Sequence, residues 1–202
     1  MKAQWMELAL TKVSTPPDPW QRTLTEHGFP ADEVISALQK SLRRGLLDNA
    51  LLLGWEMFLT SPEMEEKLWS RLCVISVEDV GLGNPQAPIL IETLYQMHQR
   101  YPRPTGDRFL FAAHAIRVIA TGPKERSSDD MVNWAMRGTA LGELKPEILD
   151  VALDMHTRRG QEMGRDYAFF MQEASKVEPA SPATEPKYRE WIVAALADGR
   201  LS

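Results

Sequence analysis

The sequence predicts an all-α protein. Apolar residues recur at helical spacing over most of the 202 residues, whereas the alternation that marks β-strands is absent. Segments rich in proline and glycine separate these periodic stretches, as expected of turns between helices. The composition, 44% hydrophobic and 25% charged, is that of a folded globular chain.

Three segments are predicted from the distribution of prolines and of apolar periodicity. Residues 1–30 form an N-terminal arm and a proline-rich linker, which contains three prolines between positions 16 and 19. Residues 31–178 form a compact helical domain. Residues 179–202 form a second proline-rich linker and a terminal helix over 186–197.

Within the domain, the first helix is predicted from residue 31, with Ala31, Val34, Ile35, Leu38 and Leu42 on one face. Gly45 suits the left-handed conformation that ends a helix. Residues 48–59 are apolar on most sides, which predicts a helix buried all round at the centre of the core. Ser61 and Pro62 then read as the N-cap and first position of the next helix.

That next helix carries an apolar face of Leu68, Leu72, Ile75 and Val80, and the segment 80–85 ends it. Further helices are predicted from Pro85 to 97, over 109–121, after the capping residues 127–130, over 146–153 and over 157–176. Glycines and prolines stand between these stretches, so each is expected to be a separate helix.

The charge balance argues against a chain built to coat DNA or an anionic membrane. Lysines and arginines number 23 and aspartates and glutamates 28, a formal net charge of −5. No apolar run reaches the ~18 residues of a membrane span. The single cysteine, Cys73, lies in an apolar run and is expected to be a buried thiol. These features favour a soluble protein of the reducing cytoplasm.

Chemical motifs are missing, and we therefore expect no enzyme, no cofactor and no metal site. No glycine-rich phosphate loop is present, and the acidic pair Glu78-Asp79 would hold magnesium only opposite such a loop. The histidines are far apart in the sequence. His114 is predicted to lie in the core, and the Asp154–His156 segment is interpreted as a helix cap in preference to an acid–base pair. A small-ligand-binding protein or an enzyme with a pocket around His114 or Asp154–His156 is the weakest alternative function.

Short basic groups and an excess of tryptophan and methionine leave two binding functions open. The candidate nucleic-acid contacts are Arg43, Arg44, Lys124, Arg126, Arg158 and Arg159, although solvated surface charges are the ordinary alternative. Trp20, Trp134 and Trp191 lie beside turns or near chain ends. They could dock onto a neighbour, or they could close the domain's own core.

Four stretches, in the same order, resemble the C-terminal region of the replication-associated recombination protein A family, which includes the Werner helicase-interacting protein. Glu78–Ala87 is similar to its Glu-Asp-x-Gly-Leu-x-x-Pro-Gln-Ala signature. Ser41–Leu51, Ala115–Lys124 and Pro146–Tyr167 resemble three other segments, although Glu125 stands where the family has serine after Pro-Lys. The resemblance covers residues 36 to 170.

Members of this family are clamp-loader-related AAA+ ATPases whose helical C-terminal region drives oligomerisation. The resemblance therefore implies a collar-like helical domain without the ATPase module, a homo-oligomer (a dimer or a tetramer), and a role in DNA replication, recombination or repair. An AAA+ ATPase or another replication protein is a candidate partner, and nucleic acid a weaker one.

The resemblance also implies a structural signature made by Glu78, Asp79, Gly81, Leu82, Pro85, Pro123 and Lys124. We expect Glu78 and Asp79 to hold the turn by bonds to backbone amides. Gly81 and Gly83 would supply backbone conformations that other residues resist.

Overall fold

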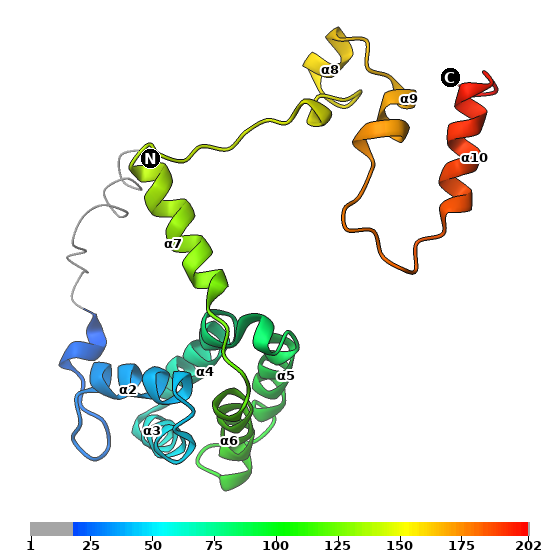
Figure 1. The fold of residues 1–202 in the computed structure, drawn as a ribbon. Helices are drawn as coiled ribbons and strands as arrows, with labels where there is room; N and C mark the ends of the chain where they lie inside the picture. The colour runs from blue at the N-terminus through cyan, green and yellow to red at the C-terminus, as the bar shows by residue number, and fades with distance from the viewer. Residues whose placement is uncertain (1–17, 202) are drawn as a thin grey trace. The chain divides into compact units, whose positions relative to one another are not determined.

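The computed structural model describes residues 18–201, and helices dominate this range (Figure 1). No strand occurs among these residues, where an isolated antiparallel bridge between Leu24 and Pro30 is the one trace of β-pairing. The all-α prediction is therefore confirmed. Positions 1–17 of the predicted N-terminal arm lie outside the described residues.

Contacts divide the chain into two units, the first ending at Leu144 and the second beginning at Lys145. The sequence-based boundaries at 30/31 and 178/179 stay a prediction. The first unit contains η1 (Pro19–Arg22), α2 (Ala31–Arg43), α3 (Leu47–Thr60), α4 (Pro62–Ile75), η2 (Ser76–Val80), η3 (Gly81–Gly83), α5 (Ala87–His98), α6 (Gly106–Thr121) and α7 (Ser127–Ala140).

Helices α2 to α6 pack around one hydrophobic core (Figure 1). Its largest fully buried side chains come from all five helices, among them Leu38, Leu42, Met57, Phe58, Leu68, Leu72, Ile75, Ile91 and Ile116. The predicted apolar faces of α2 and α4 are thus the buried faces. Burial of this apolar area is the dominant favourable term in the fold.

Local signals set the helix ends as the sequence predicts. The Ser61 hydroxyl accepts a hydrogen bond from Met64 N at 3.1 Å and Pro62 is the first residue of α4. Gly45 adopts a φ of +70° directly after α2. These two predictions are confirmed.

Three burial predictions are wrong. Helix α3 is not buried all round, because Leu52 is 67% exposed and Trp55 is 37% exposed, although the Trp55 ring packs edge-on against Phe109 of α6. Cys73 is exposed, since α4 turns Leu72 and Ile75 inward and places Cys73 on its outer face. His114 is exposed because neighbouring positions on α6 occupy the inward face.

The second unit contains η4 (Asp150–Ala152), α8 (Arg158–Glu162), α9 (Tyr167–Phe169), η5 (Phe170–Ala174) and α10 (Pro186–Ala197). The terminal helix is confirmed. The continuous helix predicted over 157–176 is wrong, because the chain turns at Gly164, whose φ is +72°. The helix predicted over 146–153 is reduced to the single turn η4.

No helix of residues 18–201 has both the length and the apolar character that a membrane crossing requires.

Candidate functional site

The signature turn lies where α4 continues into the π-helical segment η2 and then into η3. Asp79, near the end of η2, is completely buried, with 0% of its surface exposed. Gly81 follows with φ +47° and ψ −132°. A β-carbon at Gly81 would lie 2.6 Å from Glu125 O, so both the backbone conformation and the close approach require glycine.

The remaining signature residues frame this turn. Leu82 is exposed, and Pro85 lies just before α5. Gly83 packs against Pro123, whose carbonyl oxygen would be 2.7 Å from an added β-carbon. The turn is therefore in direct contact with the segment that leads from α6 to α7.

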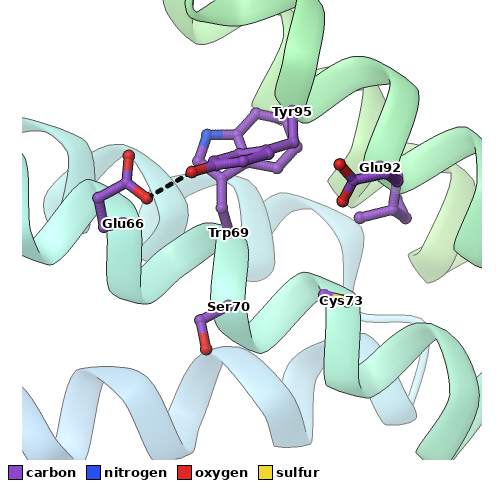
Figure 2. A pocket seen from close by; sticks show the side chains of 7 residues that line it. Glu66, Trp69, Ser70, Cys73, Glu92 and Tyr95 are labelled. Carbon is purple, nitrogen blue, oxygen red and sulfur yellow. Dashed lines mark hydrogen bonds between the residues drawn. The ribbon is translucent and has the colours of Figure 1, made fainter.

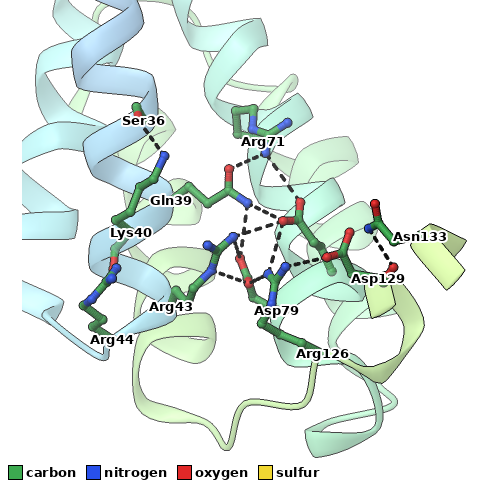
Figure 3. Close-up of polar contacts among 11 residues, drawn as sticks. Ser36, Gln39, Lys40, Arg43, Arg44, Arg71, Asp79, Arg126, Asp129 and Asn133 are labelled. Atoms are coloured by element: carbon green, nitrogen blue, oxygen red, sulfur yellow. Dashed lines mark hydrogen bonds and ion pairs between the residues drawn. The ribbon is translucent and has the colours of Figure 1, made fainter. Parts of the chain in front are cut away.

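Glu78 and Asp79 are bound by arginine side chains from distant parts of the sequence (Figure 3). Arg43 Nε donates to Asp79 Oδ1 at 2.6 Å, and Arg43 Nη2 donates to Glu78 Oε1 at 3.0 Å. Arg126 Nη1 donates to the same Asp79 oxygen and to Glu78 Oε1. The expectation that these carboxylates bond backbone amides is wrong. Their oxygens accept instead from the side chains of Arg43 on α2 and Arg126 just before α7.

Two further side chains complete the network. Arg71 Nη2 lies 3.7 Å from Glu78 Oε2 and donates to Gln39 Oε1 at 2.6 Å. Gln39 Nε2 in turn donates to Glu78 Oε1 at 2.9 Å. We call Gln39, Arg43, Arg71, Glu78, Asp79, Arg126 and Asp129 the acid–arginine network.

Charges within the acid–arginine network balance, with three arginines against three carboxylates. Burial alone would raise the pKa of Asp79, but hydrogen bonds from Arg43, Arg126 and Gln39 outweigh it and hold that pKa below its ordinary value. The hydrogen bond to Asp79 raises the pKa of Arg126. Both groups therefore stay ionised at neutral pH, and the geometry suits a structural clamp better than proton transfer.

The network also fixes the start of α7. Arg126, the residue before the helix, donates to Asp129 Oδ2 at 2.5 Å. Glu125 Oε1 accepts from Ser127 N at 2.7 Å, while Glu125 N donates to Asp79 O at 3.0 Å. Glu125 thus joins the signature turn to α7, a role that the sequence indicates only by a carboxylate just before a helix.

Lys124 caps the end of α6. Its Nζ donates to the carbonyl oxygens of Ile119 and Gly122, both at 2.6 Å, and of Ala120 at 3.2 Å. Burial lowers the pKa of Lys124, and the nearby charge of Asp79 opposes that shift only in part. The Lys124 ammonium group therefore uses its three donors on backbone carbonyl oxygens of this chain.

The candidate nucleic-acid contacts therefore lie in different settings. The structure brings Arg43 and Arg126 together, but around the buried Asp79. Arg44 is exposed and donates to Lys40 O at 3.2 Å. Arg158 and Arg159 lie on α8 in the second unit, where Arg158 is 3.6 Å from Glu162.

The Asp154–His156 segment forms both a helix cap and a side-chain pair. The Thr157 hydroxyl accepts from Gly160 N at 3.0 Å, which confirms the helix-cap interpretation, while Asp154 accepts from His156 N at 2.9 Å and its Oδ2 lies 3.0 Å from His156 Nδ1. Within the part of the chain that the structure describes, no three metal-ligating side chains come together. The sequence did not single out His98, which is the fully buried histidine of the core.

Comparison with known proteins supports the resemblance seen in the signature. No family model matches the chain. The chain is 30% identical to replication-associated recombination protein A of Bacillus subtilis (strain 168) over 139 residues. Those residues are 68% of this chain and 32% of the relative, so the chain spans about a third of that protein's length. Over this stretch the chain is similar to replication-associated recombination protein A, and the resemblance predicted from the sequence is confirmed.

Proposed function

We propose that this chain is a helical assembly module that acts in DNA replication and recombination, and that it works by self-association and not by catalysis. The relationship to replication-associated recombination protein A supports the biological setting. ATP hydrolysis is not part of the proposal, because the 202 residues carry no phosphate-loop motif.

Helix α7 is the observation that carries the proposal. None of its 14 residues is buried within the protein. Met131, Val132, Trp134 (65% exposed) and Met136 are all exposed. Since successive residues are about 100° apart around the helix axis, Met131 and Trp134 lie about 60° apart, Val132 and Met136 lie about 40° apart, and the four side chains together cover roughly 200° of the helix. Contiguous exposed apolar surface of this kind marks interaction sites, and tryptophan and methionine are enriched in them.

The acid–arginine network gives α7 a defined start. Arg126 links the helix to the buried Asp79, and Asp129 in the first turn of α7 binds the same arginine. A helix whose first turn is tied to the buried Asp79 can present these apolar side chains in a fixed position. Such preorganisation reduces the entropy that association costs.

A second copy of the chain is the occupant that we propose for this face. Most oligomers are symmetric assemblies of identical chains, in which the same surface patches meet at every interface. The exposed apolar residues of α7 on one copy can therefore be covered by a second copy. The resemblance implies self-association of the same region.

Light scattering behind a sizing column, over a concentration series, tests the proposal. We expect a mass that is a multiple of 22.9 kDa at high concentration. Trp134→Ser should weaken association at least about 30-fold, the effect of losing an interface side chain worth ~2 kcal/mol. Leu110→Ser removes a similarly exposed apolar side chain from α6 and is the matched control.

The two variants separate an interface effect from a folding effect. Since Trp134 and Leu110 are both exposed, each variant should keep the far-ultraviolet circular dichroism and thermal stability of the parent chain. A monomer at every concentration, or equal weakening by both variants, would contradict self-association through α7.

A further inference from the structure

A small groove runs between α4 and α5. Its volume is about 160 Å³, and its lining includes Glu66, Trp69, Ser70, Cys73, Glu92 and Tyr95 (Figure 2) besides the apolar Ile91. Sites for small-molecule ligands and cofactors usually measure roughly 300–1,000 Å³. The groove therefore fits a single side chain of a partner better than a complete small molecule.

The walls of the groove are negatively charged. Glu66 on α4 and Glu92 on α5 are both exposed, and they come from different helices (Figure 2). Glu66 accepts from Tyr95 Oη at 2.8 Å, and Glu92 accepts from Gln96 Nε2 at 2.7 Å. Among residues 18–201, neither carboxylate is paired with a lysine or an arginine, so each has acceptor capacity left for a cation.

The floor of the groove holds a buried donor without an acceptor. Trp69 is 3% exposed, and its indole N–H has no hydrogen-bond partner among the described residues. In Figure 2 the indole nitrogen lies at the end of the ring toward Glu66 and the Tyr95 hydroxyl. Buried donors are nearly always satisfied in folded proteins, so this N–H is open to an acceptor that residues 18–201 do not supply.

Aromatic rings add a third element of recognition. The rings of Trp69 and Tyr95 are arranged edge to face with their centroids 5.7 Å apart. Aromatic rings attract cations, and a guanidinium also stacks on them because it is planar and weakly hydrated.

We propose that the groove between α4 and α5 binds an arginine side chain presented by a segment of another protein. The planar guanidinium would lie against Tyr95 and donate to Glu66 and Glu92, since its fork of donors matches two carboxylates. A backbone carbonyl of the same segment would accept from the Trp69 N–H. A peptide carries both groups, whereas a free guanidinium ion lacks the acceptor. This inference does not depend on the proposed function, because it concerns a different face of the first unit.

Titration with capped tripeptides tests the proposal. The probes are acetyl-Gly-Arg-Gly-amide and, as the uncharged control, the same peptide with norleucine in place of arginine. Binding is followed by the indole ¹H–¹⁵N resonance of Trp69, assigned through its proximity to the Tyr95 ring. We expect a saturable shift with the arginine peptide and at least ten-fold weaker binding of the norleucine peptide and of guanidinium chloride at equal ionic strength.

Charge-neutral variants locate the contact. Glu66→Gln and Glu92→Gln should each weaken the arginine peptide by about three-fold, the range expected for partly exposed ion pairs. Glu143→Gln removes an equally exposed carboxylate outside the groove and should change nothing.

Cys73 gives a second readout, because it is the chain's single cysteine and lines the groove. The arginine peptide should slow its alkylation by iodoacetamide, as followed by intact mass. Equal binding of the arginine and norleucine peptides, or unchanged affinity in both groove variants, would overturn the proposal.

Discussion

Replacing Asp79 by asparagine removes the central charge of the acid–arginine network while keeping the side chain's size. Asp79 is completely buried and accepts from Arg43, Arg126 and Gln39. Asparagine keeps one oxygen, but its NH₂ group would face arginine donors in place of the second oxygen. The variant therefore loses the ion pairs and also sets donor against donor.

The cost can be worked out from the surroundings. Removing one partner of a buried ion pair costs ~3–5 kcal/mol when the remaining charge is left alone. Here Arg43 and Arg126 are 28% and 32% exposed at the side chain and keep Glu78 as a partner. We therefore expect the lower part of that range, about 3 kcal/mol of unfolding free energy. For a domain of this size that corresponds to roughly 6–12 °C in the melting temperature.

Urea unfolding followed by circular dichroism at 222 nm measures this loss. The slope m should stay the same, because the surface exposed on unfolding is unchanged. Asp129→Asn is the matched control, since Asp129 is partly exposed and its ion pair among residues 18–201 is with Arg126, and it should cost at most ~1 kcal/mol. If the two variants lost equal stability, or Asp79→Asn lost less than ~1 kcal/mol, the network would not be the clamp described above.

Two further predictions concern the turn and the core. Gly81→Ala should lower the free energy of unfolding, measured by thermal unfolding, by at least ~3 kcal/mol, because it adds a clash with Glu125 O to a left-handed φ. The control Gly28→Ala has a φ of +81° and open space around it, so it should lower that free energy by only ~1–2 kcal/mol. Burial lowers the pKa of His98, whose Nδ1 bonds Tyr95 O and whose Nε2 lies 3.1 Å from Arg108 Nη2. Because the unfolded chain binds a proton at His98 more readily than the folded chain, the free energy of unfolding should fall as pH drops below ~6.5, by at most ~1.4 kcal/mol per pH unit. Urea midpoints at about pH 6.5 and about pH 5.0 measure this fall. The His98→Gln variant should lack the contribution of this histidine.

Short-range patterns account for most of what could be predicted from the sequence. The apolar period of α2 and α4, the Ser61–Pro62 cap and the Gly45 terminus act over a few residues, and each appears in the structure as expected. The sequence predicts too much burial for α3, because periodicity shows which faces of a helix are apolar but not whether a neighbouring helix packs on each face. Leu52 is apolar but 67% exposed, and Trp55 stays 37% exposed even though its ring contacts Phe109 of α6.

Long-range partners are what the sequence could not supply. Glu78 and Asp79 were recognised as a signature, but their partner Arg43 lies 35 and 36 positions away and belongs to the set interpreted as candidate nucleic-acid contacts. The buried Trp69 is likewise unremarkable in the sequence, and only the packing of α4 against α5 leaves its N–H without an acceptor. Pairings of this kind depend on the tertiary fold.

Amide hydrogen exchange at two protein concentrations tests the central claim, that α7 is the surface through which copies of the chain associate. At a concentration where light scattering reports an oligomer, peptides covering residues 127–140 should exchange more slowly than in the diluted monomer. Peptides from the buried faces of α4 and α6 should exchange at the same rate in both samples, because those helices are already packed in the core. Protection that appears elsewhere while α7 exchanges equally fast in oligomer and monomer would contradict the account.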